Sequence, residues 1–353
     1  MLPKQTLVIL SPGFPKDEAD TACLPPKQLF VRLLKEQFPH LDIVIIAFQY
    51  PFQKSIYQWN GVQVISLAGR NKRKLSKLII WTKVWHQLKM LRKQKNVIGI
   101  LSFWCTEAAL IGSWFDKRHN IQHRCWISGQ DAKIENGLVK WIRPSGDELV
   151  AMSDFLADSF FKNHGIKPSH VVPIGIDKNL FNAPPSEKDI DVMGAGSLIP
   201  LKQYDVFLQV VHQLKKLQPG IKAVICGKGN EEKKLKELIR QLDLIENVVL
   251  TGEKEHKEVL HLMQRSKLFL HPSSYEGFGS VCIEALYAGA EVISFCRPMQ
   301  EPIANWHIVS DLEEMSKKAL AVLQTSSPRN KSVLAFSMED SVKAMMKAFD
   351  YKD

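Results

Sequence analysis

The chain has 353 residues, of which 45% are hydrophobic and 24% are charged. This composition is typical of folded globular domains, allows two of ordinary size, and excludes a disordered or collagen-like chain. No apolar run approaches the roughly 18 residues of a membrane-spanning helix, and the apolar stretch 6–10 is too short for the core of a signal peptide. The six cysteines form no C-x-x-C pair, so we expect reduced core thiols and a cytoplasmic location.

The formal net charge of +10 belongs to the first half of the chain. Residues 1–180 carry 25 Lys and Arg against 14 Asp and Glu, whereas the remainder carries 22 against 23. Between Ile43 and Thr106 there are 11 basic residues and no acidic one. A one-sided basic surface predicts an anionic partner, such as nucleic acid, an anionic membrane or an acidic substrate.

Short β-type runs alternate with amphipathic patterns along the chain. In the first half we predict strands at 6–11, 42–49, 62–67, 97–103, 124–128, 148–152 and 170–174, and helices at 27–37, 72–93, 106–115 and 154–163. In the second half we predict strands at 190–195, 222–226, 247–251, 267–270 and 291–295, and helices near 203–217, 231–242, 256–265 and 280–288. Strands separated by helices of this length indicate βαβ units and parallel sheets.

A linker is predicted at 182–186, where two prolines disfavour both helix and central strand. We therefore expect an α/β chain with two doubly wound, Rossmann-like domains, 1–181 and 186–334, facing each other across a cleft. The last segment, 335–353, is expected to form a helix that crosses back to the first domain. Doubly wound sheets bind ligands outside the carboxyl ends of their strands, so the loops after each strand are the places to search.

The strongest motif follows the predicted strand 267–270. Glu276 lies in a loop with two glycines, and a helix carrying Glu284 is predicted to begin near Ser280. The free N–H groups of such a helix suit a diphosphate, and each carboxylate can accept hydrogen bonds from a sugar diol. The competing interpretation is a helix cap for Glu276 and a solvated charge for Glu284. We expect His271, which precedes a proline, to satisfy backbone groups.

Three further segments follow strands of the second half. Gly196 and Ser197 come after the first strand, and Lys202 would place a positive charge where the next helix begins. A plain βα turn with a surface lysine is the alternative interpretation. Gly229 ends the Cys-Gly-Lys-Gly turn after the second strand, and 252–254 is the Gly-Glu-Lys turn after the third. Their joint placement at strand ends favours a ligand site.

These segments resemble the donor domain of the family 4 retaining glycosyltransferases, which have the GT-B fold. The resemblance covers about 190–295 and rests on the segments 196–202, 226–229 and 276–284. It is looser in the first half, where Ser153 and 173–177 are similar to the end of the family's acceptor domain. The resemblance implies an acceptor-binding first domain and a donor-binding second domain.

The resemblance also implies roles for single residues. Lys202 would neutralise the diphosphate leaving group, Glu276 would bind hydroxyls of the donor sugar, and Glu284 would bind those of the ribose. The other donor-binding residues that it implies are Gly13, Gly196, Ser197, Gly229, Gly252, Glu253, Phe278, Gly279, Ser280 and Val281. Two features depart from the family: Ser197 stands where an arginine is usual, and the loop at Gly13 has one glycine where a pair is common.

Two features of the first half leave alternatives open. Asp131 follows the predicted strand 124–128 and either orients the acceptor as a catalytic base or caps the next turn. The segment Arg70–Lys95 has ten basic residues and no acidic one. Its apolar helical stripe consists of Leu75, Leu78, Ile79, Thr82, Trp85 and Leu88, extended by Trp81, Val84 and Leu91. The segment is either an ordinary basic helix packed on the sheet or an interfacial helix on anionic lipid, with Trp81 and Trp85 near the headgroups.

We predict retaining transfer of a hexose from a nucleoside diphosphate sugar to a hydroxyl of a saccharide or lipid-linked acceptor. The setting would be synthesis of a bacterial surface polysaccharide or glycolipid, in the cytoplasm or peripherally on the inner face of the membrane. No cofactor and no tightly bound metal are expected. The alternatives are a nucleotide-sugar epimerase of the same fold and a basic membrane- or nucleic-acid-binding protein without catalysis. Nucleic acid is disfavoured because aromatic and basic residues do not converge on a recognised module.

Overall fold

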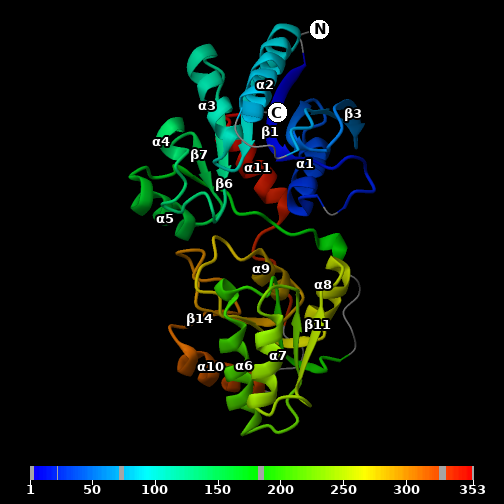
Figure 1. Cartoon of the computed structure of the whole chain (residues 1–353), viewed down its shortest axis with the longest axis vertical. Coiled ribbons are helices and arrows are strands. Elements are labelled where there is room, and N and C mark those ends of the chain that lie inside the picture. Colours follow the sequence, from blue (N-terminus) through cyan, green and yellow to red (C-terminus); the bar gives the residue numbers. More distant parts are fainter. Residues whose placement is uncertain (1–3, 22, 71–74, 182–186, 326–330, 352–353) are drawn as a thin grey trace. The chain divides into compact units, whose positions relative to one another are not determined.

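A computed structural model of the chain describes residues 4–21, 23–70, 75–181, 187–325 and 331–351. The chain divides into two compact units (Figure 1). Unit 1 consists of Met1–Gly175 together with Met338–Asp353, and unit 2 consists of Ile176–Ser337. The division therefore lies before the expected boundary at 181, and the predicted linker 182–186 lies outside the described residues.

Unit 1 contains an eight-stranded sheet in the order β3-β4-β2-β1-β5-β6-β7-β8. Its strands are β1 Gln5–Gly13, β2 Asp42–Tyr50, β3 Ser55–Trp59, β4 Val62–Ser66, β5 Asn96–Phe103, β6 His123–Ile127, β7 Leu149–Ala151 and β8 His170–Val171. All neighbours are parallel except β3 and β4. The central β1 is buried on both faces, as expected for a parallel strand covered by helices.

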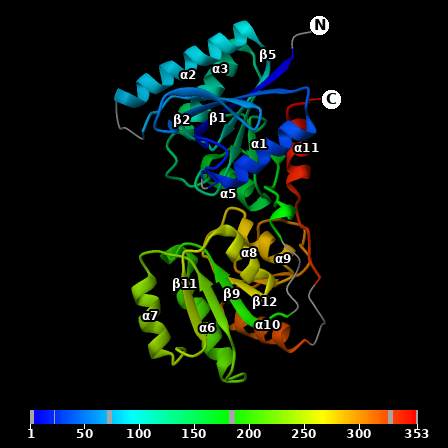
Figure 2. The same cartoon turned by 90° about the vertical axis from the view of Figure 1, so that its right-hand side faces the viewer.

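Helices cover both faces of this sheet (Figure 2). They are α1 Pro25–Gln37, α2 Leu75–Gln94, α3 Glu107–His119, α4 Val139–Ile142, α5 Asp154–His164 and α11 Met338–Ala348. α2 and α3 pack on one face, and α1 and α11 lie side by side on the other. α11 is held by Phe349, whose ring fills the space beside Gly99, and by the Ala348 carbonyl, which accepts from Arg124 Nε at 2.7 Å.

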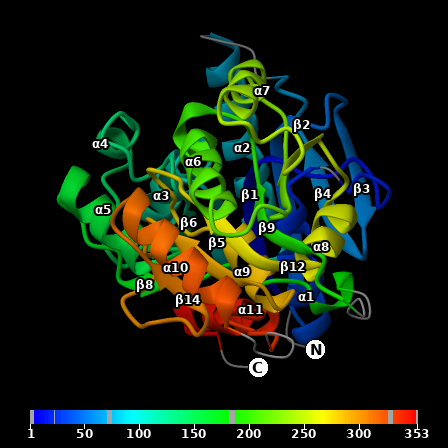
Figure 3. The same ribbon diagram turned by 90° about the horizontal axis from the view of Figure 1, so that it is seen from below.

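Unit 2 contains a six-stranded parallel sheet in the order β11-β10-β9-β12-β13-β14. Its strands are β9 Ile190–Ala195, β10 Ala223–Cys226, β11 Val248–Gly252, β12 Ser266–His271, β13 Glu291–Ser294 and β14 Trp306–Ile308. Its helices are α6 Tyr204–Lys215, α7 Glu232–Gln241, α8 His256–Gln264, α9 Ser280–Tyr287 and α10 Leu312–Gln324, with 3₁₀ turns at Lys178–Leu180 and Pro200–Lys202. α6 and α10 lie side by side (Figure 3), and α8 packs beside α9.

The structure adds elements that the sequence patterns did not predict. β3 is a short edge strand with alternating exposure, and it forms an antiparallel hairpin with β4 across the turn at Asn60 and Gly61. An Asn-Gly pair between two strands is a local hairpin signal that the predicted elements did not include. β14 and α10 complete unit 2. No helix in the described part of the chain combines the length and the apolar character needed to cross a bilayer.

The predicted apolar stripe of α2 is confirmed at Val84, Leu88 and Leu91 and wrong at Leu78 and Ile79. Leu78 and Ile79 are 50% and 55% exposed. The buried positions are Ile80, Val84, Leu88 and Leu91, which recur at helical spacing and pack into the core of unit 1. The many apolar residues of this segment allow two adjacent stripes, and only packing against the sheet selects one. Trp85 is likewise packed edge-on against a core ring rather than free for headgroups.

Candidate functional site

The candidate site lies in unit 2, in the loops that follow β9, β10, β11 and β12. These strands are neighbours in a parallel sheet, so their carboxyl ends meet at one edge. Backbone hydrogen bonds join the first two loops, from Gly196 N–H to the Cys226 carbonyl at 2.9 Å and from Leu198 N–H to the Lys228 carbonyl at 3.0 Å. The loops therefore form one continuous surface.

Glycines make this close packing of loops feasible. A Cβ on Gly229 would lie 2.1 Å from the Leu198 carbonyl oxygen, and one on Gly227 would lie 1.8 Å from the Gly196 carbonyl oxygen. Gly196 and Gly227 also have φ of +147° and +152°, which other residues rarely adopt. Gly229, a predicted donor-binding residue, is thus required first of all for packing against the Leu198 backbone.

The chemical centre of these loops is Glu276. Its Oε2 accepts a hydrogen bond from Lys202 Nζ at 2.5 Å and another from His271 Nε2 at 3.1 Å. The expectation that His271 satisfies backbone groups is therefore wrong, because its ring turns toward the carboxylate five residues later. Both bonds reach the same oxygen, which leaves Oε1 of Glu276 to accept from a ligand.

A second set of contacts fixes the two loops that carry this cluster. The Ser274 N–H and hydroxyl both donate to the Leu201 carbonyl, at 3.0 and 3.3 Å. Leu201 lies in the 3₁₀ turn Pro200–Lys202, so the loop bearing Glu276 is tied beside the turn bearing Lys202. The thiol of Cys296 adds a contact to the Ser273 carbonyl at 3.2 Å.

The charges in this cluster are compensated. Burial would raise the pKa of Glu276, but the hydrogen bond from His271 and the positive charge of Lys202 outweigh it and lower the pKa to about 2. Burial lowers the pKa of His271. Glu276 is therefore ionised at every physiological pH, and it is suited to accepting hydrogen bonds from hydroxyls rather than to donating a proton.

The N-terminus of α9 begins in the same loop. Gly279 is the N-cap with φ of +78°, and the first amides of the helix, at Ser280 and Val281, have no intrahelical acceptor. Phe278 is buried, and its ring centroid lies 5.6 Å from that of Phe336, so its side chain anchors the loop in the protein interior. Its backbone rather than its ring is available to a ligand.

Glu284, in the second turn of α9, already has a partner. Its Oε1 accepts from Nε2 of His256, the first residue of α8, at 2.9 Å. The sequence patterns did not single out His256. The remaining predicted residues of these loops lie at the same edge: Ser197 and Glu253 are exposed, and Gly252 has φ of +72°.

Unit 1 presents different chemistry at the carboxyl ends of its sheet. Gly13 ends β1 and is buried. Asp131 is buried, and its Oδ2 accepts from the Ser128 N–H at 2.7 Å, which favours the interpretation as a turn cap. Burial raises its pKa to about 6. Nearby Lys27 is also buried, with Nζ 3.3 Å from the centroid of a Trp126 ring and without a hydrogen-bond acceptor among the described residues.

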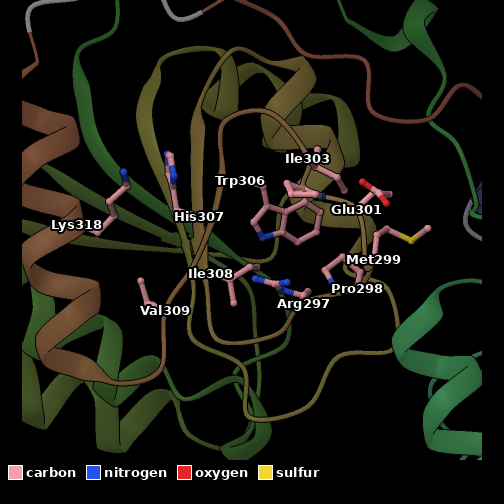
Figure 4. A pocket seen from close by; sticks show the side chains of 11 residues that line it. Arg297, Pro298, Met299, Glu301, Ile303, Trp306, His307, Ile308, Val309 and Lys318 are labelled. Carbon is pink, nitrogen blue, oxygen red and sulfur yellow. The ribbon is translucent and has the colours of Figure 1, made fainter.

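A hollow of about 370 Å³ lies beside the α9 loop (Figure 4). Trp306 lies between His307 and Lys318 on one side and Glu301 on the other. The Trp306 indole donates to the Ser294 hydroxyl at 2.8 Å, and its ring supports the N-cap of α9. None of the predicted donor-binding residues lines this hollow, so it adjoins the candidate site without containing it.

Residues 176–307 match the family model described as glycosyl transferases group 1. This part of the chain is therefore similar to the group 1 glycosyltransferases. The matched segment includes all four loops of the candidate site. Over 203 residues the chain is 25% identical to the phosphatidylinositol N-acetylglucosaminyltransferase gpi3 subunit of Schizosaccharomyces pombe, covering 56% of this chain and 44% of that protein. The chain spans less than half the length of this relative, and the same holds for the glycogen synthase of Mycobacterium tuberculosis that it also matches.

Two solved structures extend the likeness to the whole chain. Sucrose-phosphate synthase from Thermosynechococcus elongatus has a TM-score of 0.67 at 16% identity, covering 98% of this chain and 96% of that protein. Alr3699/HepE of Anabaena, in complex with UDP and glucose, has a TM-score of 0.63 at 16% identity, covering 98% and 95%. These likenesses confirm the predicted α/β fold of the chain, with two Rossmann-like domains of the GT-B type.

Proposed function

We propose that this protein transfers a sugar from a nucleoside diphosphate sugar to a hydroxyl group, with retention, and that the loops of unit 2 bind the donor. The observation that carries the proposal is the cluster of Lys202, Glu276 and His271, with Glu284 on the adjoining helix. The gpi3 relative is named as an N-acetylglucosaminyltransferase, and HepE was solved with UDP and glucose. Both are consistent with a donor of this class.

In this proposal catalysis is electrostatic. Glu276 holds hydroxyls of the donor sugar through Oε1, Glu284 holds the ribose, and the amides of Ser280 and Val281 receive the diphosphate. Lys202 stabilises the negative charge that develops on the leaving diphosphate. Because Ser197 replaces the usual arginine, Lys202 carries a larger share of this charge. Retention requires the acceptor to approach on the face from which the diphosphate departs, and we assign no protein nucleophile and no metal.

We further propose a lipid-linked acceptor, with α2 docking unit 1 on the inner, anionic face of a membrane. Leu78 and Ile79 are exposed on this helix, and Lys83, Lys89 and Lys93 are exposed along it. Exposed apolar side chains beside lysines suit the interface of an anionic bilayer. This arrangement differs from the predicted one, because leucine and isoleucine rather than tryptophan would enter the lipid.

The test is a panel of UDP-glucose, UDP-N-acetylglucosamine and GDP-mannose, with the thermal midpoint and nucleotide release as measurements. At least one donor should raise the midpoint by mass action. Glu284→Ala should weaken binding of the matching nucleoside diphosphate by about 1.5–3 kcal/mol, since charge-assisted hydrogen bonds are lost. Absence of any stabilising donor, or an unchanged affinity in Glu284→Ala, would contradict the proposal. Return of a free epimerised sugar would point to an epimerase instead.

A further inference from the structure

The carboxylate of Glu284 is held by a side chain from a different helix. His256 Nε2 lies 2.9 Å from Glu284 Oε1, and the two side chains are 45% and 20% exposed. α8 and α9 pack beside each other on the same face of the unit 2 sheet. The pair therefore lies at the surface of the candidate site, within reach of a ligand.

His256 projects from a fixed point of the backbone. It is the first residue of α8, and the N-cap residue Glu255 forms a reciprocal capping box with Glu258. In this box the Glu255 N–H donates to Glu258 Oε2 at 3.2 Å. A capping box satisfies backbone donors that the first turn leaves unpaired, so it holds the start of the helix in place. The imidazole consequently reaches Glu284 from a defined direction.

The polarity of the contact is also defined. A carboxylate only accepts hydrogen bonds, so Nε2 of His256 is the donor. The hydrogen bond to Glu284 raises the pKa of His256, although burial acts in the opposite direction. Oε1 of Glu284 is thereby engaged, while Oε2 and the second lone pair of Oε1 remain for other donors.

We propose that His256 is a positioning residue that orients the Glu284 carboxylate to accept hydrogen bonds from the ribose diol of a nucleoside diphosphate. This inference rests on the proposed function, in which Glu284 binds the ribose. A glutamate on a helix surface has several rotamers, and a ligand that selects one of them loses affinity. The hydrogen bond from His256 selects the rotamer before the nucleotide arrives.

The test separates contact with the diol from general support of the fold. UDP is compared with 2′,3′-dideoxy-UDP, which lacks both ribose hydroxyls, by calorimetry on wild type, His256→Ala and His256→Gln; GDP and its dideoxy analogue run in parallel. His256→Ala should bind UDP about 3- to 10-fold more weakly and the dideoxy analogue unchanged. His256→Gln should bind UDP like wild type, because its amide N–H lies near the position of Nε2.

Lys257→Ala is the matched control, since it removes an exposed charge from the same helical turn without touching Glu284. It should leave both affinities unchanged. An equal loss for both nucleotides in His256→Ala, or no loss for either, would overturn the inference while leaving the donor site intact. If wild type binds both nucleotides of each pair equally well, the ribose contact of Glu284 is itself wrong and the inference falls with it.

Discussion

Two carboxylates, one in each unit, have pKa values displaced in opposite directions. Glu276 in unit 2 is paired with Lys202 and His271, and its pKa is lowered to about 2. Asp131 in unit 1 accepts from Ser128 and has its pKa raised to about 6, because burial outweighs those hydrogen bonds. Both residues follow a strand of a parallel sheet, so the position in the fold does not decide the chemistry.

The difference lies in whether a cation can reach the carboxylate. In unit 2 the lysine bonds directly to Glu276, so burial strengthens the pair. In unit 1 the buried Lys27 rests on the rings of Phe103 and Trp126 and donates no hydrogen bond within the described residues. Burial lowers its pKa well below the ordinary value. A buried charge without a direct partner costs stability, whereas a paired charge at a binding edge is available for function.

The largest expected effect comes from breaking the pair in unit 2. Lys202→Ala should lower kcat about 10²- to 10³-fold, because it removes the charge that stabilises the leaving diphosphate. The KM for the donor should change less, since the interaction strengthens in the transition state. Steady-state kinetics with the donor that the nucleotide-sugar panel selects measures both kcat and KM. Lys216→Ala, on the exposed end of α6, should behave like wild type. A change in KM alone would make Lys202 a ground-state binding residue.

The next effect concerns the isolated carboxylate in unit 1. With a pKa of about 6 in the folded state and 3.8 ordinarily, Asp131 makes the folded protein bind more protons than the unfolded chain between these values. Stability should therefore fall by about 2.4 kcal/mol as the pH rises from 4 to 7. Asp131→Asn has no group to ionise at this position. The unfolding free energy of the variant relative to wild type should therefore increase as the pH rises from 4 to 7. Asp158→Asn, at an exposed position of α5, is the control, and its unfolding free energy should depend on pH as that of wild type does.

A smaller increase in the unfolding free energy is expected from replacing the buried amine of Lys27. Lys27→Met keeps the aliphatic contacts with the aromatic rings and should raise the unfolding free energy at pH 7 by about 1–3 kcal/mol. The gain should shrink as the pH approaches 10.5, because the unfolded chain then also loses the proton. Chemical denaturation of Lys27→Met and of the exposed variant Lys140→Met checks this. A lower unfolding free energy for Lys27→Met would show that the interactions of the amine stabilise the fold by more than its burial costs.

The smallest effect per residue is expected for the proposed membrane docking of α2. Replacing Lys83, Lys89 and Lys93 by glutamine should weaken binding to anionic vesicles by about 1 kcal/mol per residue. High salt should weaken it in wild type, because the attraction is screened within about 10 Å at 0.1 M. The control replaces three exposed lysines of α7, Lys233, Lys234 and Lys236, and should leave sedimentation with vesicles unchanged. Equal binding to neutral and anionic vesicles would remove the docking proposal and leave the donor site untouched.

The amino-acid sequence by itself determined the alternation of strands and helices and the places where loops leave the sheets. The strand predicted at 190–195 coincides with β9, and most other predicted elements agree within a few residues. The positions of Glu276 and Lys202 at strand ends follow from the same patterns. These features depend on local backbone preference and on apolar periodicity, both of which a short window of sequence contains.

Only the tertiary structure decided which side chains meet. Lys202 reaches Glu276 across 74 positions of the chain, and His256 reaches Glu284 across 28. The tertiary structure also decided which positions of α2 are buried, and it placed the Asp131 carboxylate where it accepts from the Ser128 N–H. Each of these outcomes depends on how helices and loops pack on a completed sheet. Local periodicity can name the loop that carries a functional carboxylate, but long-range packing selects its partner and therefore its charge.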